Sequence, residues 1–240
     1  MRLKLTLDPL ESFPYDAVGK HAVQGFIYAH LSGTKWGMRH DEKRFKFFTF
    51  SDIFPSGNFV PGKPKTLIIS SPDEGFIETL YEKMLPEETV YLGTHALRLT
   101  SLKKFRLRPK NKFITGSPIV LRSMRGQGYF TFYHEKSLIF FVTRITENAR
   151  KKYEAFYNEP APLDGFLFDR MIPRVRKNGW VDVYVRVKMH GAEFDIPGST
   201  WKLLEKKITP ENRKFYQFIM DAGVGELNSL GFGFINPVRD

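Results

Sequence analysis

A glycine-rich segment near the end of this 240-residue chain gives the backbone freedom to approach a ligand closely. Residues 223–233 read Gly-Val-Gly-Glu-Leu-Asn-Ser-Leu-Gly-Phe-Gly. A phosphate chain is one ligand that needs such an approach. A predicted helix precedes these glycines, whereas a P-loop or a dinucleotide fingerprint places its glycines between a strand and a following helix. A tight turn explains the pattern equally well, so spacing alone leaves both interpretations open.

Basic residues are the second feature with chemical consequences. Residues 98–152 contain 14 Lys and Arg and 2 acidic residues, a net charge of +12. The rest of the chain contains 23 basic and 24 acidic residues, so the whole positive excess of the chain lies in this block. A basic residue recurs there at every second position, at Lys104, Arg106, Arg108, Lys110 and Lys112. Period two predicts one face of a strand, with Pro109 on an edge strand, at a bulge or at the end of the strand. Because like charges repel, we expect a polyanion to neutralise this row; the alternative is a solvated face.

The elements that position these residues follow from periodicity. In the first half, alternation predicts strands over residues 2–8, 45–54, 65–70 and 90–99, and helical spacing predicts helices over 17–31 and 71–84. In the second half, we predict extended segments over 102–108, 119–122, 180–189 and 232–235, and helices over 147–157 and from Thr209 to Gly223. The fold class is therefore α+β, with two tandem ferredoxin-like (RRM-like, βαββαβ) domains, 1–100 and 101–240.

Composition narrows the class of protein. The chain has no cysteine, which excludes disulfides, thiolate nucleophiles and cysteine-based zinc sites. It has no membrane-length apolar run and no signal peptide, so we expect a cytoplasmic protein without a membrane partner. Helix-turn-helix and zinc-finger spacings are missing, and ferredoxin-like units commonly bind single-stranded RNA, so the expected polyanion is RNA. Phe232 is a candidate for stacking on a base.

The chain resembles the CRISPR-associated endoribonucleases of the RAMP superfamily, which mature guide RNA by cutting the repeat of its precursor. Residues 228–233 match that family's glycine-rich loop, residues 24–28 its first helix, and residues 40–51 the segment before its second strand. The chain looks like an archaeal, Pyrococcus-like member. The resemblance implies metal-independent cleavage without a cofactor. It also implies single-stranded CRISPR repeat RNA as the partner, other CRISPR effector proteins as further candidates, and a monomer or a homodimer. The family includes homologues that bind repeat RNA without cutting it.

The resemblance also assigns residues. The family's catalytic Tyr, His and Lys correspond to Tyr28, His40 and Lys46. The histidine is a general base or acid for the 2′-OH, the tyrosine orients that hydroxyl, and the lysine stabilises charge on the phosphate. By type alone each is an ordinary helix, loop or strand residue, and the joint match singles them out. The expected RNA-binding residues are Lys104, Arg106, Arg108, Lys110, Lys112, Arg122, Arg125, Gly223, Gly225, Asn228, Ser229, Gly231, Phe232 and Gly233.

Overall fold

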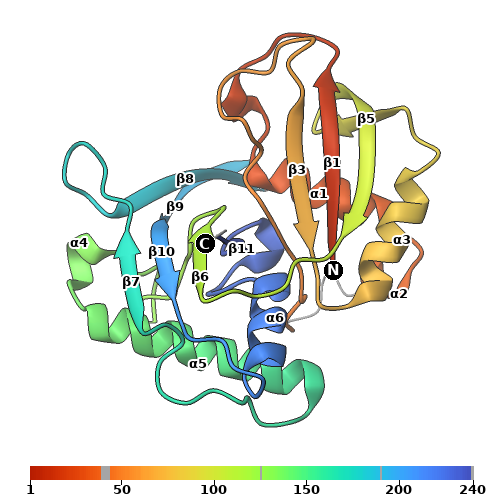
Figure 1. Ribbon diagram of the computed structural model, residues 1–240. Coiled ribbons are helices and arrows are strands. Elements are labelled where there is room, and N and C mark those ends of the chain that lie inside the picture. The colour runs from red at the N-terminus through yellow and green to blue at the C-terminus, as the bar shows by residue number, and fades with distance from the viewer. Residues whose placement is uncertain (39–43, 125, 190, 239–240) are drawn as a thin grey trace.

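The computed structural model describes residues 1–38, 44–124, 126–189 and 191–238, arranged as two halves that lie side by side (Figure 1). In the N-terminal half, five antiparallel strands form a sheet in the order β2-β3-β1-β5-β4. They are β1 (Arg2–Pro9), β2 (Thr49–Phe50), β3 (Lys65–Ser70), β4 (Thr89–Leu92) and β5 (His95–Phe105). The helices of this half are α1 (Lys20–His30), α2 (Lys35–Met38) and α3 (Glu74–Met84), with a 3-10 turn η1 (Tyr15–Ala17).

Alternation in the sequence explains how this half packs. Leu3, Leu5 and Leu7 of β1 are fully buried and share one apolar core with Ile27 of α1 and Leu80 of α3. Period two therefore gives the sheet one covered face, and helical spacing gives each helix one buried stripe.

The C-terminal half has a second sheet, in the order β11-β6-β10-β7. Its strands are β6 (Lys112–Thr115), β7 (Arg170–Pro173), β10 (Trp201–Glu205) and β11 (Ile235–Pro237). Its helices are α4 (Phe132–Glu135), α5 (Leu138–Tyr157) and α6 (Arg213–Ala222), with a 3-10 turn η3 (Asn228–Leu230). In each half the first and last strands of the βαββαβ unit pair in antiparallel fashion, which confirms the predicted pair of ferredoxin-like units.

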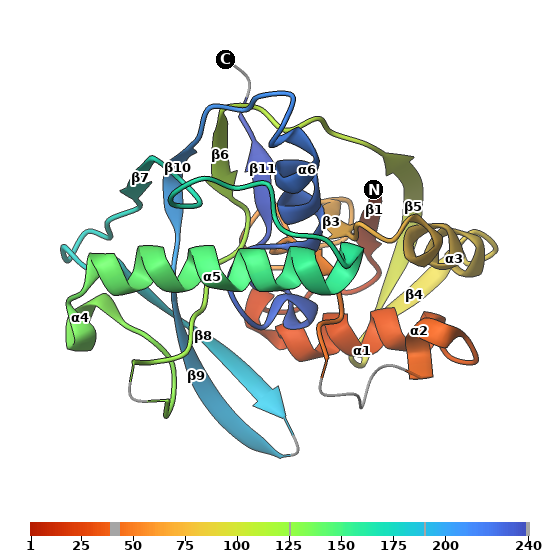
Figure 2. The ribbon, with the colours of Figure 1, turned by 90° about the horizontal axis from the view of Figure 1, so that it is seen from below.

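Several predicted elements differ from the structure. Of the strand predicted over 45–54 only β2 forms, and the last strand, β11, begins at Ile235. Three further differences change the architecture. The strand predicted over 180–189 lies outside the sheet: β8 (Asp182–Met189) and β9 (Ala192–Ser199) form a separate ribbon inserted between β7 and β10 (Figure 2). Strand β5 continues past residue 100, so the chain passes from the first sheet to the second between Phe105 and Lys112. Helix α5 begins at Leu138, well before the predicted start, because Ser137 caps it.

A buried polar contact joins the two halves. The Arg2 side chain is fully buried, and its guanidinium donates to the carbonyl oxygens of Met220 and Ile235, at 2.9 and 2.8 Å. Asp221 lies 3.5 Å from the same guanidinium and also accepts a hydrogen bond from Ser70. Buried charges are tolerated when they are paired in this way, so α6 and the first sheet are fixed against each other. Within the described ranges, no helix is long and apolar enough to cross a membrane.

Candidate functional site

The glycine-rich segment follows α6 and lies between the two halves. Gly223 ends the helix with a φ of +85°, as predicted. A Cβ on Gly231 would lie 2.1 Å from the Phe50 ring, and a Cβ on Gly233 would lie 1.8 Å from the carbonyl oxygen of Val224. Packing within the chain therefore requires glycine at these two positions. For these two residues, a tight turn explains the glycine pattern without a ligand.

Gly231→Ala is expected to lower the free energy of unfolding by about 1–3 kcal/mol, because the new methyl overpacks the Phe50 ring and φ is +78°. Urea denaturation measures this loss. Gly165→Ala is the matched control, since Gly165 also has a positive φ, +66°, but nothing lies within 4 Å of its Cβ position. A loss of the same size in both variants would assign the effect to backbone strain instead of the Phe50 contact.

Side chains of the N-terminal half hold the backbone of this segment. The Lys20 ammonium donates to the carbonyl oxygen of Gly231 at 2.7 Å, and the Thr49 hydroxyl donates to that of Phe232 at 2.9 Å. The Gln24 amide donates to the carbonyl oxygen of Ser229 at 3.0 Å. The glycine-rich segment is thus anchored on α1 and β2 although it belongs to the C-terminal half.

Lys152 of α5 holds the same segment from the other side. Its buried ammonium donates to the carbonyl oxygens of Gly223 and Gly225 and, at 2.8 Å, to Oδ1 of Asn228. Burial lowers the pKa of Lys152 to about 7, against the opposing attraction of Glu226. Three oxygen acceptors match the three N–H donors of an ammonium, so this lysine fixes the conformation of the segment.

A cleft of about 430 Å³ opens beside the anchored segment. The residues that line it come from three places: the chain before β2 (Arg44, Phe45, Lys46 and Phe47), α5 (Arg144, Asn148, Lys151 and Lys152), and the end of α6 with the stretch after it (Ala222, Gly225, Glu226, Leu227, Asn228 and Ser229). Five of them are Lys or Arg and one is acidic, and that carboxylate pairs with Arg144 at 3.2 Å. The buried Oδ1 of Asn148 has no hydrogen-bond partner in the described residues. The cleft therefore presents mainly positive charge, which suits a polyanion.

The structure brings two of the three predicted catalytic residues to adjoining elements. Lys46 lines the cleft, and Tyr28, half-buried on α1, lies edge-on to Phe48, with ring centroids 5.7 Å apart. Gln24, one turn before Tyr28, is bonded to the cleft residue Ser229. His40 lies outside the described residues, and the described chain resumes at Arg44, on the wall of the cleft.

Some of the predicted RNA-binding residues of the C-terminal half lie at the cleft, and others do not. Gly225, Asn228 and Ser229 line the cleft, and Arg122 lies 3.7 Å from the cleft residue Glu226. Arg125 lies outside the described residues. The prediction that the Phe232 ring stacks on a base does not hold in the structure, because this ring is fully buried in an apolar cluster with Leu230.

The alternating basic row was wrongly predicted to occupy one strand face. Strand β5 ends at Phe105, β6 begins at Lys112, and the residues between them form a connection, which Figure 2 shows on the opposite side of the molecule from α1. Lys104 pairs with Glu78 of α3, and Arg106 pairs with Glu74 of the same helix at 2.5 Å. The period-two pattern continues past the end of β5, so it does not mark a strand there, and acidic residues of α3, distant in sequence, already neutralise part of the row.

Sequence reasoning missed the basic residues of α5 that line the cleft. Arg144, Asn148 and Lys151 recur at positions i, i+4 and i+7, which places them on one helical face. This signal was hidden because the predicted helix began only at residue 147. When the helix begins at Leu138, the basic residues Arg144 and Lys151 lie together on one face of α5.

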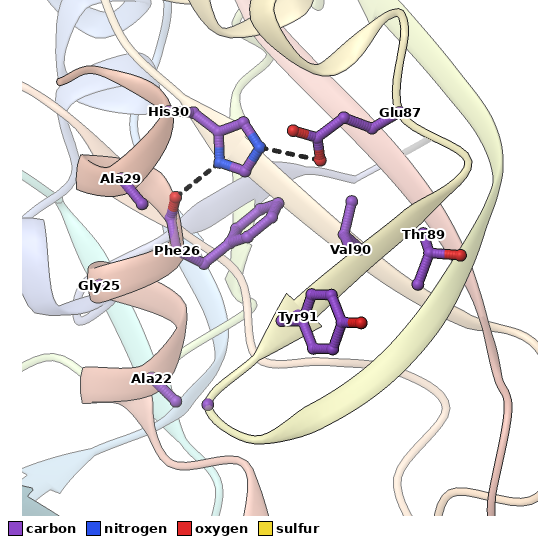
Figure 3. Close-up of a pocket in the computed structure, with 10 residues that line it drawn as sticks. Ala22, Gly25, Phe26, Ala29, His30, Glu87, Thr89, Val90 and Tyr91 are labelled. Atoms are coloured by element: carbon purple, nitrogen blue, oxygen red, sulfur yellow. Dashed lines mark hydrogen bonds and ion pairs between the residues drawn. The ribbon is translucent and has the colours of Figure 1, made fainter. Parts of the chain in front are cut away.

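A second hollow, of about 530 Å³, lies between α1 and the β4–β5 hairpin (Figure 3). The His30 ring contacts the Phe26 carbonyl oxygen at 2.8 Å and the Glu87 carboxylate at 3.1 Å there. None of the described residues that line it is Lys or Arg. It is larger than the basic cleft but has the wrong charge for a polyanion, so we assign the candidate site to the cleft.

Comparisons with known proteins place this fold in a family. The family described as "CRISPR associated protein Cas6, C-terminal" matches residues 101–237. The protein "CRISPR-associated endoribonuclease Cas6 2" of Methanocaldococcus jannaschii is 57% identical, and the match covers 100% of each chain. A solved structure named "CRISPR associated protein Cas6" is similar with a TM-score of 0.70 and 24% identity, over 100% of this chain and 99% of that chain.

Another solved structure, "An RAMP protein binding different RNA substrates", is similar with a TM-score of 0.71 and 18% identity over 100% of each chain. At this identity the likeness concerns the fold, and it matches the tandem ferredoxin-like architecture seen here. Together with the family match over residues 101–237 and the full-length relative at 57% identity, it leads to one conclusion: this chain belongs to the Cas6 family of CRISPR-associated proteins.

Proposed function

We propose that this protein binds single-stranded CRISPR repeat RNA in the basic cleft and cuts it within the repeat to mature guide RNA. The main support for the proposal is the cleft itself. Lys46, Arg44, Arg144 and Lys151 line it beside the anchored glycine-rich segment. Such a wall attracts a phosphate backbone. The relative that is 57% identical is named an endoribonuclease, which supports cleavage as the outcome of binding.

The proposed reaction uses the nucleophile that RNA carries. A general base, His40, takes the proton of a 2′-OH, whose oxygen attacks the adjacent phosphorus. The bond from phosphorus to the 5′-oxygen breaks, and that oxygen receives a proton from water, giving a 2′,3′-cyclic phosphate and a 5′-OH. Tyr28 orients the 2′-OH, and the Lys46 ammonium stabilises the negative charge that develops on the phosphate oxygens. Because side chains supply both proton transfer and charge, the proposed mechanism needs no metal.

Incubation of the protein with repeat RNA in EDTA tests the proposal. We expect cleavage at one position, a product with a cyclic-phosphate end, and no cleavage when the 2′-OH at that position is replaced by hydrogen. A stable complex with intact RNA would show instead a homologue that binds without cutting. Cleavage that appears only after a divalent cation is added would contradict the metal-independent mechanism.

Lys151→Glu is expected to weaken binding of repeat RNA and to reduce the slope of log Kd against log salt concentration by about one, because one phosphate contact is lost. Fluorescence anisotropy at several salt concentrations measures both quantities. Lys83→Glu is the matched control, since Lys83 is exposed on α3 and lies outside the residues that line the cleft. Equal effects of the two reversals would show that the cleft is not the RNA path.

A further inference from the structure

Two exposed aromatic rings stack on each other at one end of the C-terminal half. Tyr133 of α4 and Trp180, just before β8, have ring centroids 4.8 Å apart and planes inclined by 14°. The two residues are 54% and 41% exposed. Aromatic rings of this size usually contribute to stability by burial, so a half-exposed stack leaves ring surface for another planar group.

Buried and local hydrogen bonds hold the stack in place. The carboxylate of Asp182, itself buried, accepts from the backbone N–H groups of Phe132 and Tyr133, both at 2.9 Å. On the other side, the backbone N–H of Arg176 donates to the carbonyl oxygen of Trp180 at 2.9 Å, which closes the turn before β8. Both rings are thus positioned before a ligand arrives, so little conformational entropy is lost on binding.

The turn beside the stack is basic. Residues 170–181 contain four Lys or Arg and no acidic residue, and Arg174, Arg176 and Lys177 are exposed. Exposed aromatic rings next to exposed cations are the combination with which proteins bind single-stranded nucleic acids: the rings stack on bases, and the cations contact the backbone. An apolar docking surface for a protein would be depleted of charge at its centre.

The stack is also connected to the cleft by α5. Helix α4 leads directly into α5, and Figure 2 shows α4 and the chain entering β8 at the same end of this long helix. The cleft residue Arg144 follows the cap residue Ser137 by about 10 Å along the axis. An RNA strand that leaves the cleft along α5 therefore reaches the stack within a few nucleotides.

We propose that Tyr133 and Trp180 form a stacking platform for a base of the bound RNA that lies away from the cleaved linkage. The inference rests on the proposed function, since it extends the path of the same RNA. The platform recognises the flat face of a base and contributes affinity and register, while the cleft holds the phosphates that flank the cut.

Binding of 2′-O-methylated repeat RNA tests the platform, because this probe has no free 2′-OH and is bound whether or not the protein cleaves RNA. Trp180→Ala is expected to weaken binding about 5- to 100-fold, the range for loss of one stacked base. Trp180→Phe, which keeps a ring, should bind close to wild type. Tyr91→Ala is the control, because Tyr91 is 60% exposed on β4 of the other half.

A scan with single abasic nucleotides locates the stacked base. One abasic position should weaken binding to the wild type and have no further effect on Trp180→Ala. Wild-type affinity of a folded Trp180→Ala variant, or the same abasic profile for both proteins, would overturn the platform while leaving the cleavage proposal intact. Conversely, intact repeat RNA in the cleavage assay would refute the proposed reaction without changing this binding scan.

Discussion

His40→Ala is expected to slow cleavage of repeat RNA by about 10²- to 10⁴-fold, because a positioned general base or acid contributes a factor of this size. Binding should remain near normal, since the cleft keeps Lys46 and the basic residues of α5. Single-turnover cleavage with excess protein measures the chemical step, and anisotropy with 2′-O-methylated repeat RNA measures binding. A split between the two measurements is the signature of a residue that acts on the reaction.

His21→Ala is the matched comparison, because His21 is an exposed residue on α1, the helix that carries Tyr28. We expect this variant to cleave RNA at the wild-type rate. The assignment fails if His40→Ala cuts as fast as the wild type. A large loss in His21→Ala with little loss in His40→Ala would transfer the proton-transfer role to α1.

Lys152→Met is expected to lower the free energy of unfolding by about 3–5 kcal/mol, because it leaves the buried carbonyl oxygens of Gly223 and Gly225 and the amide oxygen of Asn228 without their donor. Methionine retains much of the apolar volume of the side chain, so the loss reports mainly on hydrogen bonding. Repeat-RNA affinity should fall as well, since the glycine-rich wall of the cleft loses its anchor on α5. Urea denaturation and anisotropy check the two effects.

Lys151→Met separates these effects, because Lys151 is exposed and lines the same cleft. It should weaken RNA binding with little loss of stability. If Lys152→Met were as stable as Lys151→Met, the anchoring role of Lys152 would be refuted.

The pKa shift of Lys152 adds a dependence on pH. The unfolded chain holds this proton up to the ordinary pKa of 10.5, whereas burial lowers the pKa of the folded protein's Lys152 to about 7. Unfolding therefore takes up a proton between these values, and the wild type should gain stability relative to Lys152→Met as the pH rises across that window. A difference in stability that stays constant from pH 7 to 10 would contradict a lowered pKa.

The fold class could be predicted from the amino-acid sequence because the signals for its helices and strands are local. Alternation in β1, the apolar stripes of α1 and α6, and the helix end at Gly223 all depend on residues within a few positions of one another. The order of these elements then leaves few topologies, and the tandem ferredoxin-like pair is one of them. The match of the glycine-rich segment to a known family was likewise available from consecutive residues.

The construction of the site depended on contacts between residues far apart in the chain. Gly231 meets Phe50, Lys152 binds the segment after α6, and Arg106 pairs with Glu74. No local period encodes such pairs. From periodicity alone, the Phe232 ring was therefore expected to be accessible to a base, and the basic row was expected to lie on one strand. In the folded chain the Phe232 ring is buried, and acidic residues of α3 pair with part of the basic row. The positive cleft is formed instead by α5 and the residues before β2. Local periodicity specifies elements, whereas the partner of each charge and the exposure of each ring depend on which elements pack together.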